Sequence, residues 1–410
     1  MFDPVSPLPA IASLFFAGFT AHILACKFGP PSEEGRFVAI DGLRGYLAFF
    51  VFLHHSCIWY FFLKTGRWEV PPSNLYTNFG QGSVAFFFMI TGFLFFTKIL
   101  NDRVKGTDWI KLYVSRALRL VPLYFFTMML LFLMVAVLSH GSLNESPSQL
   151  ILNTVKWLSF TIFQTSNLDL NGVKNTFVIV AGVAWSLPYE WFFYLSLPLL
   201  ALVVGNIPPM KFLALGILGI VGFAKIYSIP WHLLSFAGGI FAALIVRFEW
   251  FRKFSSKRAF SFFLMSSLGL AFTFFPSSYA PIPFLLISLS FALIAGGNTM
   301  FGVLSSRVSL TLGEMAYSIY LLQGPMLFVL FNFLIGWRRA ELLPASVHWL
   351  LVILMTPVLV SICFLTFHFI ERPAMQSAET VTNRIRSALR RSGTRDQTML
   401  SNEKNNRHSL

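Results

Sequence analysis

Charged side chains are scarce in this chain of 410 residues, where Asp, Glu, Lys and Arg together account for 12%. A soluble globular domain carries about 25% charged residues. Apolar residues instead reach 56%, and the mean hydropathy is +0.68. This deficit of charge excludes an ordinary soluble domain and predicts an all-α helical bundle that crosses a membrane several times.

Cysteine is also scarce, with three residues at widely separated positions, Cys26, Cys57 and Cys363. Their spacing fits neither a disulfide framework nor a zinc motif. The eight histidines form no metal-ligand spacing, and no glycine-rich phosphate loop is found in the sequence. We therefore expect no metal site and no nucleotide-binding loop in this chain.

Acidic residues are outnumbered by basic residues, 17 against 31, which gives a formal net charge of +14. In a soluble protein such an excess would suggest nucleic acid as a partner. In a membrane protein it has a simpler explanation, because loops on the cytoplasmic side are enriched in Lys and Arg. We therefore expect the lipid bilayer, and no nucleic acid, among the partners of this chain.

Long apolar runs are abundant, and ten of them have the length and composition of membrane spans. They cover residues 41–63, 82–98, 117–139, 185–204, 211–228, 230–246, 259–276, 281–299, 314–336 and 347–371. When both ends of this bundle are placed in the cytoplasm, most of the 31 basic residues fall in cytoplasmic segments. This predicts a multi-pass protein of the plasma membrane or an endomembrane, with a cytoplasmic C-terminus.

Two segments do not fit this pattern. Residues 7–26 are apolar enough to span, and no basic region of the kind that marks a cleavable signal precedes them. Both an additional N-terminal span and a helix lying at the interface stay open for them. Residues 151–184 lack clear charged flanks, and we expect a loop that partly dips into the bundle.

The chain is predicted to have three parts. An N-terminal apolar segment with a linker covers residues 1–35, and a transmembrane domain covers residues 36–375. The tail at 376–410 is polar, basic and almost free of aromatic residues, so we expect it to be disordered in the cytoplasm.

Arg44 and His55 lie eleven positions apart inside the first apolar run. Ionisable side chains are costly in lipid, so a functional role is the default interpretation of such residues. Eleven residues at about 100° each return to within roughly 20° of the starting direction, so both side chains share one helix face. They are about 16 Å apart along the helix axis. One face thus carries a cation near one membrane surface and a proton acceptor deeper inside.

Further polar residues flank the apolar runs. Arg116 and Arg119 are three residues apart, so they share a helix face and suit phosphate groups. Glu190 places a carboxylate near the start of the fourth predicted span, residues 185–204. Simpler roles stay open, because the arginines could serve only to set topology and Glu190 could be an interfacial carboxylate bonded to a nearby loop.

Six motifs follow one another along the chain. They are Asp41-Gly42-Leu43-Arg44-Gly45 with His55, Phe87-Phe88-Met89-Ile90-Thr91-Gly92-Phe93, Arg116-Ala117-Leu118-Arg119-Leu120-Val121-Pro122-Leu123-Tyr124, Trp185-Ser186-Leu187 with Glu190 and Tyr194, Tyr317-Ser318-Ile319-Tyr320-Leu321-Leu322, and Glu371-Arg372-Pro373. In this order they resemble the membrane acyltransferase-3 family, whose members O-acylate sugars, lipids and small molecules. The resemblance covers about residues 36–375, and although each motif alone is weak, the ordered set is specific.

The resemblance implies transfer of an acyl group from cytoplasmic acyl-CoA, with acetyl-CoA favoured, to a hydroxyl of a carbohydrate, lipid or small-molecule acceptor. On this hypothesis acyl-CoA is a co-substrate, and no metal takes part. Arg116 and Arg119 attract the phosphates of CoA, and Arg44 lies nearer the thioester.

The same hypothesis assigns catalytic roles to three residues. His55 is the general base that removes the proton of the acceptor hydroxyl, a task for which a neutral imidazole is suited at neutral pH. Glu190 and Asp41 are candidate orienting or charge-balancing partners of His55 and Arg44, respectively. An acyl-histidine intermediate stays open as a variant of this mechanism.

One position departs from the family pattern. Many members have a histidine directly after the motif at 317–322, where this chain has Gln323. Glutamine can hydrogen-bond but cannot carry a proton, so we expect a structural or substrate-orienting role there. A transporter or flippase without acyl chemistry is the alternative function, since intramembrane charges also line transport paths. A scaffold that has lost catalysis is a third.

Overall fold

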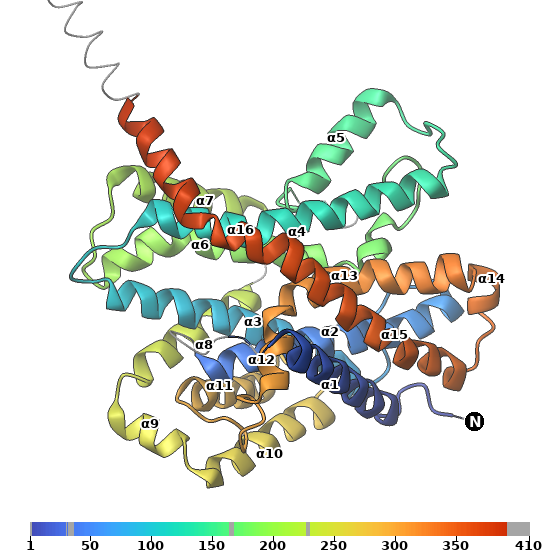
Figure 1. The fold of residues 1–410 in the computed structure, drawn as a ribbon, viewed down its shortest axis with the longest axis horizontal. Helices are drawn as coiled ribbons and strands as arrows, with labels where there is room; N and C mark the ends of the chain where they lie inside the picture. The colour runs from blue at the N-terminus through green and yellow to red at the C-terminus, as the bar shows by residue number, and fades with distance from the viewer. Residues whose placement is uncertain (1, 30, 32–36, 164–167, 227–229, 392–410) are drawn as a thin grey trace, which may run out of the picture.

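The fold is helical throughout the part of the chain that is described. The computed structural model describes residues 2–29, 31, 37–163, 168–226 and 230–391. Within these ranges the structure has no strand, and the only extended pairing is a single bridge between Leu170 and Val173. Figure 1 shows the helices packed into a bundle, which confirms the all-α prediction.

Seven helical segments among the described residues are long and apolar enough to cross a membrane. They are α1 (Leu8–Phe28), α2 (Val38–Thr65), α3 (Asn74–Asn101), α4 (Trp109–Leu138), a segment ending in α6 (Leu187–Val203), one beginning with α13 (Ala316–Phe328), and one beginning with α15 (Ala345–Thr366). An eighth arises if α8 (Pro230–Ile245) and α9 (Glu249–Ser255), bent by 109°, form one broken span.

The predicted count of ten spans is not confirmed. Three of the predicted runs contain short helices, α7 (Met210–Ile226), α10 (Arg258–Phe274) and α11 (Pro281–Ala295), with 17, 17 and 15 residues. At 1.5 Å per residue these are at most about 26 Å long, less than the roughly 30 Å of a hydrocarbon core. An apolar run can exceed the helix inside it, because α11 ends before Gly296 and Gly297 although the run continues to 299.

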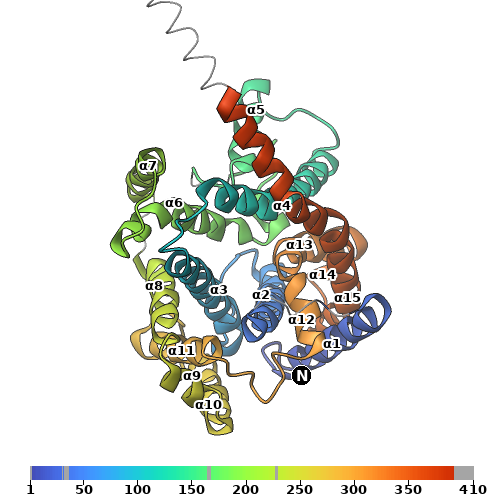
Figure 2. The same ribbon diagram turned by 60° about the vertical axis from the view of Figure 1, so that its left-hand side comes forward.

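Helix α2 lies at the centre of the bundle. Buried residues make up 78% of its apolar window, against 33% for α1. It packs against α3, α13 and the short α12 (Arg307–Glu314), as Figure 2 shows. The N-terminal segment at 7–26 forms α1, which packs on α12 and α15 at the edge of the bundle. A polar side chain in the middle of α2, such as that of His55, is therefore enclosed by protein.

Helices α3 and α8 pack with their backbones in close contact. A Cβ atom at Gly92 of α3 would overlap the carbonyl of Phe236, and one at Gly239 of α8 would overlap the carbonyl of Met89. Small residues permit such close approach between helices in membranes. The second predicted span, residues 82–98, thus forms a close helix interface through Gly92.

The segment at 151–184 enters the bundle, as the sequence predicts. Its first part continues α5 (Pro147–Leu158), which packs on α4. Its second part forms two 3₁₀ turns, η1 (Thr176–Val180) and η2 (Val183–Ser186), most of whose side chains are buried. The turn η1 contacts α13 and α4, so the loop reaches the core.

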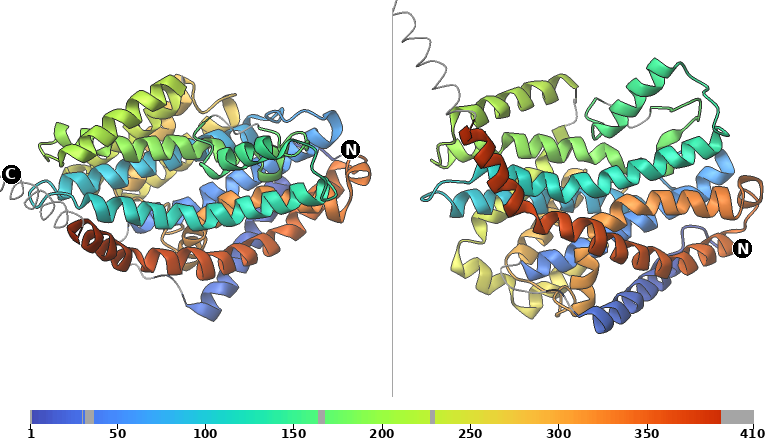
Figure 3. Two further views of the ribbon diagram at one scale, coloured as in Figure 1. Left: turned by 90° about the horizontal axis from the view of Figure 1, so that it is seen from above. Right: turned by 45° about the horizontal axis from the view of Figure 1, so that its top comes forward.

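The tail is helical as far as Arg391, whereas the sequence predicts disorder from residue 376. The helix that starts at Ala345 continues through a π-helical segment, η4 (Phe367–Glu371), and α16 (Arg372–Gln376) to Arg391. Figure 3 shows it as one long path along the bundle. Ion pairs of Asp108 with Arg386 and of Lys111 with Glu379 (3.6 Å) hold it against the start of α4. Residues 392–410 lie outside the described part of the chain.

Candidate active site

Three arginines meet in one cavity of about 110 Å³ between α2, α3, α4, α6 and α13. We call it the arginine cavity. Arg44 comes from α2, whereas Arg116 and Arg119 come from α4. Glu190 of α6 and Tyr317 of α13 line the same space. Four of the predicted site residues, far apart in the sequence, are thereby brought together.

Arg116 has aromatic and hydroxyl neighbours in this cavity. Its guanidinium carbon lies 5.1 Å from the centre of the Phe95 ring, and its side chain hydrogen-bonds to Tyr194. The hydroxyl of Tyr194 in turn donates to Oε1 of Glu190. The Nε–H of Arg116 has no hydrogen-bond partner among the described residues. Buried donors are almost always bonded, so the hydrogen-bonding capacity of this group is unmet.

Arg44 has a carboxylate partner on its own helix. Its Nη1 lies 3.5 Å from Oδ1 of Asp41, with the two side chains 16% and 21% exposed. Both residues also line a small cavity of about 30 Å³ together with Arg119 and Glu371. The structure therefore contains the predicted contact between Asp41 and Arg44.

Glu371 is a carboxylate to which the sequence assigns no role. It is 2% exposed and accepts a hydrogen bond from Oγ of Ser318, which itself accepts one from Thr366 at 3.0 Å. It ends the π-helical segment η4, and π-helical turns occur often at functional sites. The sequence did contain a signal for Glu371, since this carboxylate ends the apolar run 347–371. Ionisable groups in such runs are functional candidates.

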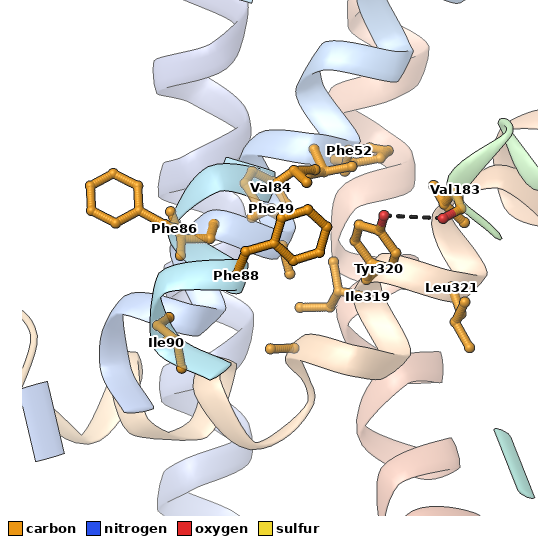
Figure 4. Packing of buried hydrophobic residues seen from close by; sticks show 14 of the residues in the cluster. Phe49, Phe52, Val84, Phe86, Phe88, Ile90, Val183, Ile319, Tyr320 and Leu321 are labelled. Carbon is orange, nitrogen blue, oxygen red and sulfur yellow. Dashed lines mark hydrogen bonds between the residues drawn. The ribbon is translucent and has the colours of Figure 1, made fainter. Parts of the chain in front are cut away.

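His55 lies in a second cavity of about 310 Å³, which we call the histidine cavity. The lining also includes His54, Trp185, His232 and Tyr279. Val84 and Tyr320 line both cavities and so form a common wall. Figure 4 shows Tyr320 and its hydrogen bond to the carbonyl of Val183, beside the packed side chains of α2 and α3.

The partner of His55 is not the predicted one. Its Nδ1 lies 2.9 Å from the side-chain amide of Gln323, which is fully buried on α13. Glu190 lies instead in the arginine cavity, bonded to Tyr194. Sequence spacing could not reveal this, because the pairing depends on how α13 and α6 turn around α2.

Aromatic and neighbouring histidine side chains complete the surroundings of His55. Trp68, from the loop after α2, stacks on its ring with centroids 6.1 Å apart and planes at 21°. The adjacent His54 bonds through Nδ1 to the carbonyl of Tyr76 at 2.7 Å. Since a carbonyl only accepts, His54 donates there and serves to join α2 to α3. No signal in the sequence points to Trp68.

Metal chemistry has no visible ligand set in the described ranges. No group of three or more His, Cys, Asp or Glu side chains there is arranged to hold an ion. Cys57 and Cys363 are buried and unpaired, and Cys26 is exposed.

Comparison with protein families gives a match over most of the chain. A family model described as an acyltransferase domain, Acyl_transf_3, matches residues 37–368, a range that contains both cavities. No curated protein and no solved structure matches the chain.

Proposed function

The chain belongs to the membrane acyltransferase-3 family, and from this premise we propose that it transfers an acyl group, with acetyl favoured, from acyl-CoA to a hydroxyl group. The acceptor belongs to the carbohydrates, lipids or hydroxylated small molecules. In this proposal the arginine cavity and the C-terminus face the cytoplasm, where acyl-CoA is supplied, and the protein lies in the plasma membrane or an endomembrane.

The adjacency of the two cavities is the observation that carries this proposal. One cavity holds three guanidinium groups and the next holds an imidazole, with Val84 and Tyr320 between them. An acyl transferase must bring an anionic donor and a neutral hydroxyl acceptor together from different directions. A basic chamber that adjoins a chamber with a proton acceptor supplies both conditions.

The arginine cavity is assigned to the donor. Guanidinium groups bind phosphate oxygens through charge-assisted, often bidentate, hydrogen bonds. Arg116 and Arg119 bind phosphates of CoA, for which the unpartnered Nε–H of Arg116 supplies a donor. Arg44, whose helix also carries His55, lies toward the thioester. Three cations in one cavity also attract the donor before it binds.

The histidine cavity is assigned to the acceptor. His55 takes the hydroxyl proton as the acceptor oxygen attacks the thioester carbonyl. The C–S bond then breaks, the acyl group stays on the acceptor oxygen, and the proton passes from the imidazole to the departing CoA thiolate. General base catalysis of this kind contributes about 10²–10⁴-fold in rate.

The carboxylates are assigned to charge balance within the arginine cluster. Asp41 partners Arg44, and Glu190 acts through Tyr194 on Arg116. This replaces the predicted role of Glu190 as an orienting partner of His55. Without such counter-charges, three neighbouring guanidinium groups would repel one another in a medium of low dielectric.

Purified protein incubated with radiolabelled acetyl-CoA and a panel of hydroxyl acceptors tests the proposal. We expect release of free CoA thiol together with label on an acceptor. His55→Ala should lower this turnover at least about 100-fold. His22→Ala is the matched control, because His22 is an exposed histidine on the peripheral α1.

Undiminished turnover in a folded His55→Ala protein would remove the imidazole from the mechanism. Movement of label across a vesicle membrane without covalent change would instead assign the protein to transport. Binding of acetyl-CoA alone, with neither result, would indicate a protein that has lost catalysis.

A further inference from the structure

The side-chain amide of Gln323 contacts the imidazole of His55, the proposed base. Its side chain is fully buried, and one amide atom lies 2.9 Å from Nδ1 of His55. We propose that Gln323 is a positioning residue that accepts the Nδ1–H of His55 through Oε1 and so leaves the other ring nitrogen, Nε2, free to act as the base. This inference rests on the proposed function, in which His55 is that base.

The reason lies in the two tautomers of imidazole. A neutral ring carries one N–H donor and one bare nitrogen acceptor, and the bond made by one nitrogen fixes the state of the other. If the amide NH₂ donates to Nδ1, the hydrogen of His55 must sit on Nε2, which then cannot take a proton. If the amide oxygen accepts from Nδ1, the lone pair of Nε2 is free.

The amide can present either end to the ring. A half-turn about the last side-chain bond of glutamine exchanges its oxygen and nitrogen without moving the rest of the side chain. With the nitrogen toward Nδ1, Oε1 of Gln323 is buried and has no partner among the described residues. Leaving a buried polar atom unbonded costs about 1–3 kcal/mol. The half-turn gives that oxygen a donor, the Nδ1–H of His55, and moves the amide NH₂ to the place where the oxygen had no partner. The requirement for a bare Nε2, and not this energy, therefore favours the orientation with Oε1 toward the ring.

The backbone around Gln323 keeps the amide at the ring. At the next residue, Gly324, a Cβ atom would overlap the backbone of Val180 in η1, so α13 lies directly against the buried loop. Pro325 follows within the same helix. His55, on α2, faces α13 through the bundle's centre. The pair thus joins two helices that cannot separate without opening the core.

Fixing the tautomer of His55 is a role that a glutamine at position 323 can fill. A group that only fixes a tautomer needs an acceptor atom and no proton of its own. The amide oxygen meets that requirement, and it also excludes a second charge from the centre of the bundle, where an unpaired charge would be costly.

Nitrogen-15 NMR of histidine-labelled protein in lipid tests the inference directly. The signals of His55 are identified by their absence in His55→Ala. We expect a protonated Nδ1 and a bare Nε2 for His55 in the wild type, and a mixture of tautomers in Gln323→Leu. A wild-type ring with its hydrogen on Nε2 would overturn the inference.

Two variants give a kinetic readout. Gln323→Glu supplies an oxygen that can only accept, so kcat should stay within about tenfold of wild type. Gln323→Leu should lower kcat about 10–100-fold, the usual effect of removing a hydrogen-bonded support, with KM for acetyl-CoA unchanged. A fully active Gln323→Leu protein would also overturn the inference.

These readouts separate the two proposals. The NMR measurement does not require turnover, so it decides the role of Gln323 even if no acceptor is found. If the tautomer is as expected but His55→Ala remains fully active, the proposed function fails while the Gln323 contact stands. If Gln323→Glu fails to fold because of its buried charge, the wild-type spectrum and Gln323→Leu still give the answer.

Discussion

The hydroxyl groups of Ser186 and Tyr320 lie 2.8 Å apart at the boundary between the two cavities. Ser186 lines the arginine cavity, and Tyr320 lines both. Tyr320 also donates to the carbonyl of Val183 at 3.1 Å. The dividing wall is therefore held by a short hydrogen-bonded link between the buried turn η2 and helix α13.

Tyr320→Ala should open this wall. Water would then reach a bound thioester, and acceptor-independent release of CoA should rise several-fold relative to transfer, since active sites exclude water to prevent such side reactions. The ratio of CoA released without and with acceptor measures the effect. Tyr320→Phe keeps the ring and should cost about 1 kcal/mol of stability with the ratio unchanged. An unchanged ratio in Tyr320→Ala would show that Tyr320 does not separate the two cavities.

Arg119→Gln should weaken donor binding in a way that depends on the phosphates of CoA. A hydrogen bond to a charged group is worth about 1.5–3 kcal/mol, so KM for acetyl-CoA should rise about 10–100-fold. S-acetyl-pantetheine, which has no phosphate, should show little change.

Arg252→Gln is the control for this experiment, because Arg252 lies on α9 and lines neither cavity. Equal losses for both donors in Arg119→Gln would show that this guanidinium does not recognise phosphate.

Acid should release the tail helix from α4. Burial opposes ionisation of Asp108, but the hydrogen bonds from Arg386 and from the backbone of Lys111, with their charges, lower its pKa below 3.8. A lowered pKa in the folded state gives stabilisation that is fully present above the unfolded value and is lost as the pH falls through the lowered one. A spin label at Ser387→Cys, in a Cys26→Ser background, should therefore become mobile as the pH falls through the lowered pKa of Asp108.

Asp108→Asn should mobilise the same label already at neutral pH. Asparagine still caps the helix at this N-cap position, so only the ion pair is removed. Glu249→Gln breaks a different surface pair, with Lys253, and should leave the label unchanged. Identical label mobility in Asp108→Asn and wild type would show that Arg386 does not hold the tail.

Gly92→Ala should destabilise the protein. The added methyl group would overlap the carbonyl of Phe236, and overpacking of this kind costs typically about 1–3 kcal/mol or more. Thermal unfolding in detergent measures the change. Gly269→Ala is the matched control, because a Cβ atom there has no neighbour within 4 Å. A Gly92→Ala protein as stable as the control would contradict the close α3–α8 packing.

The class of fold was predictable from the sequence, because a charge deficit and long apolar runs leave helices as the simplest membrane structure. The number of spans was not. Helix ends depend on residues such as Gly296 and Gly297 inside an apolar run, and hydropathy does not register them. The helical tail was missed for another reason: its ion pairs with Asp108 and Lys111 come from a distant part of the chain.

The site was predictable as a set of residues but not as a set of contacts. Helical spacing placed Arg44 and His55 on one face, and the structure shows them in two cavities that share Val84 and Tyr320. The neighbours of each group depend on packing between helices. For that reason Gln323 and the backbone of Val51, and not Glu190, proved to be hydrogen-bond partners of His55.

Arg44 and His55 are carried by the same uninterrupted helix α2. The offset between the cation that faces one chamber and the imidazole that faces the other is therefore fixed by the helical screw. Inserting a single alanine between them would rotate the ring by about 100° out of its chamber. The number of residues between these two positions is consequently not free to vary, whatever happens to their identities.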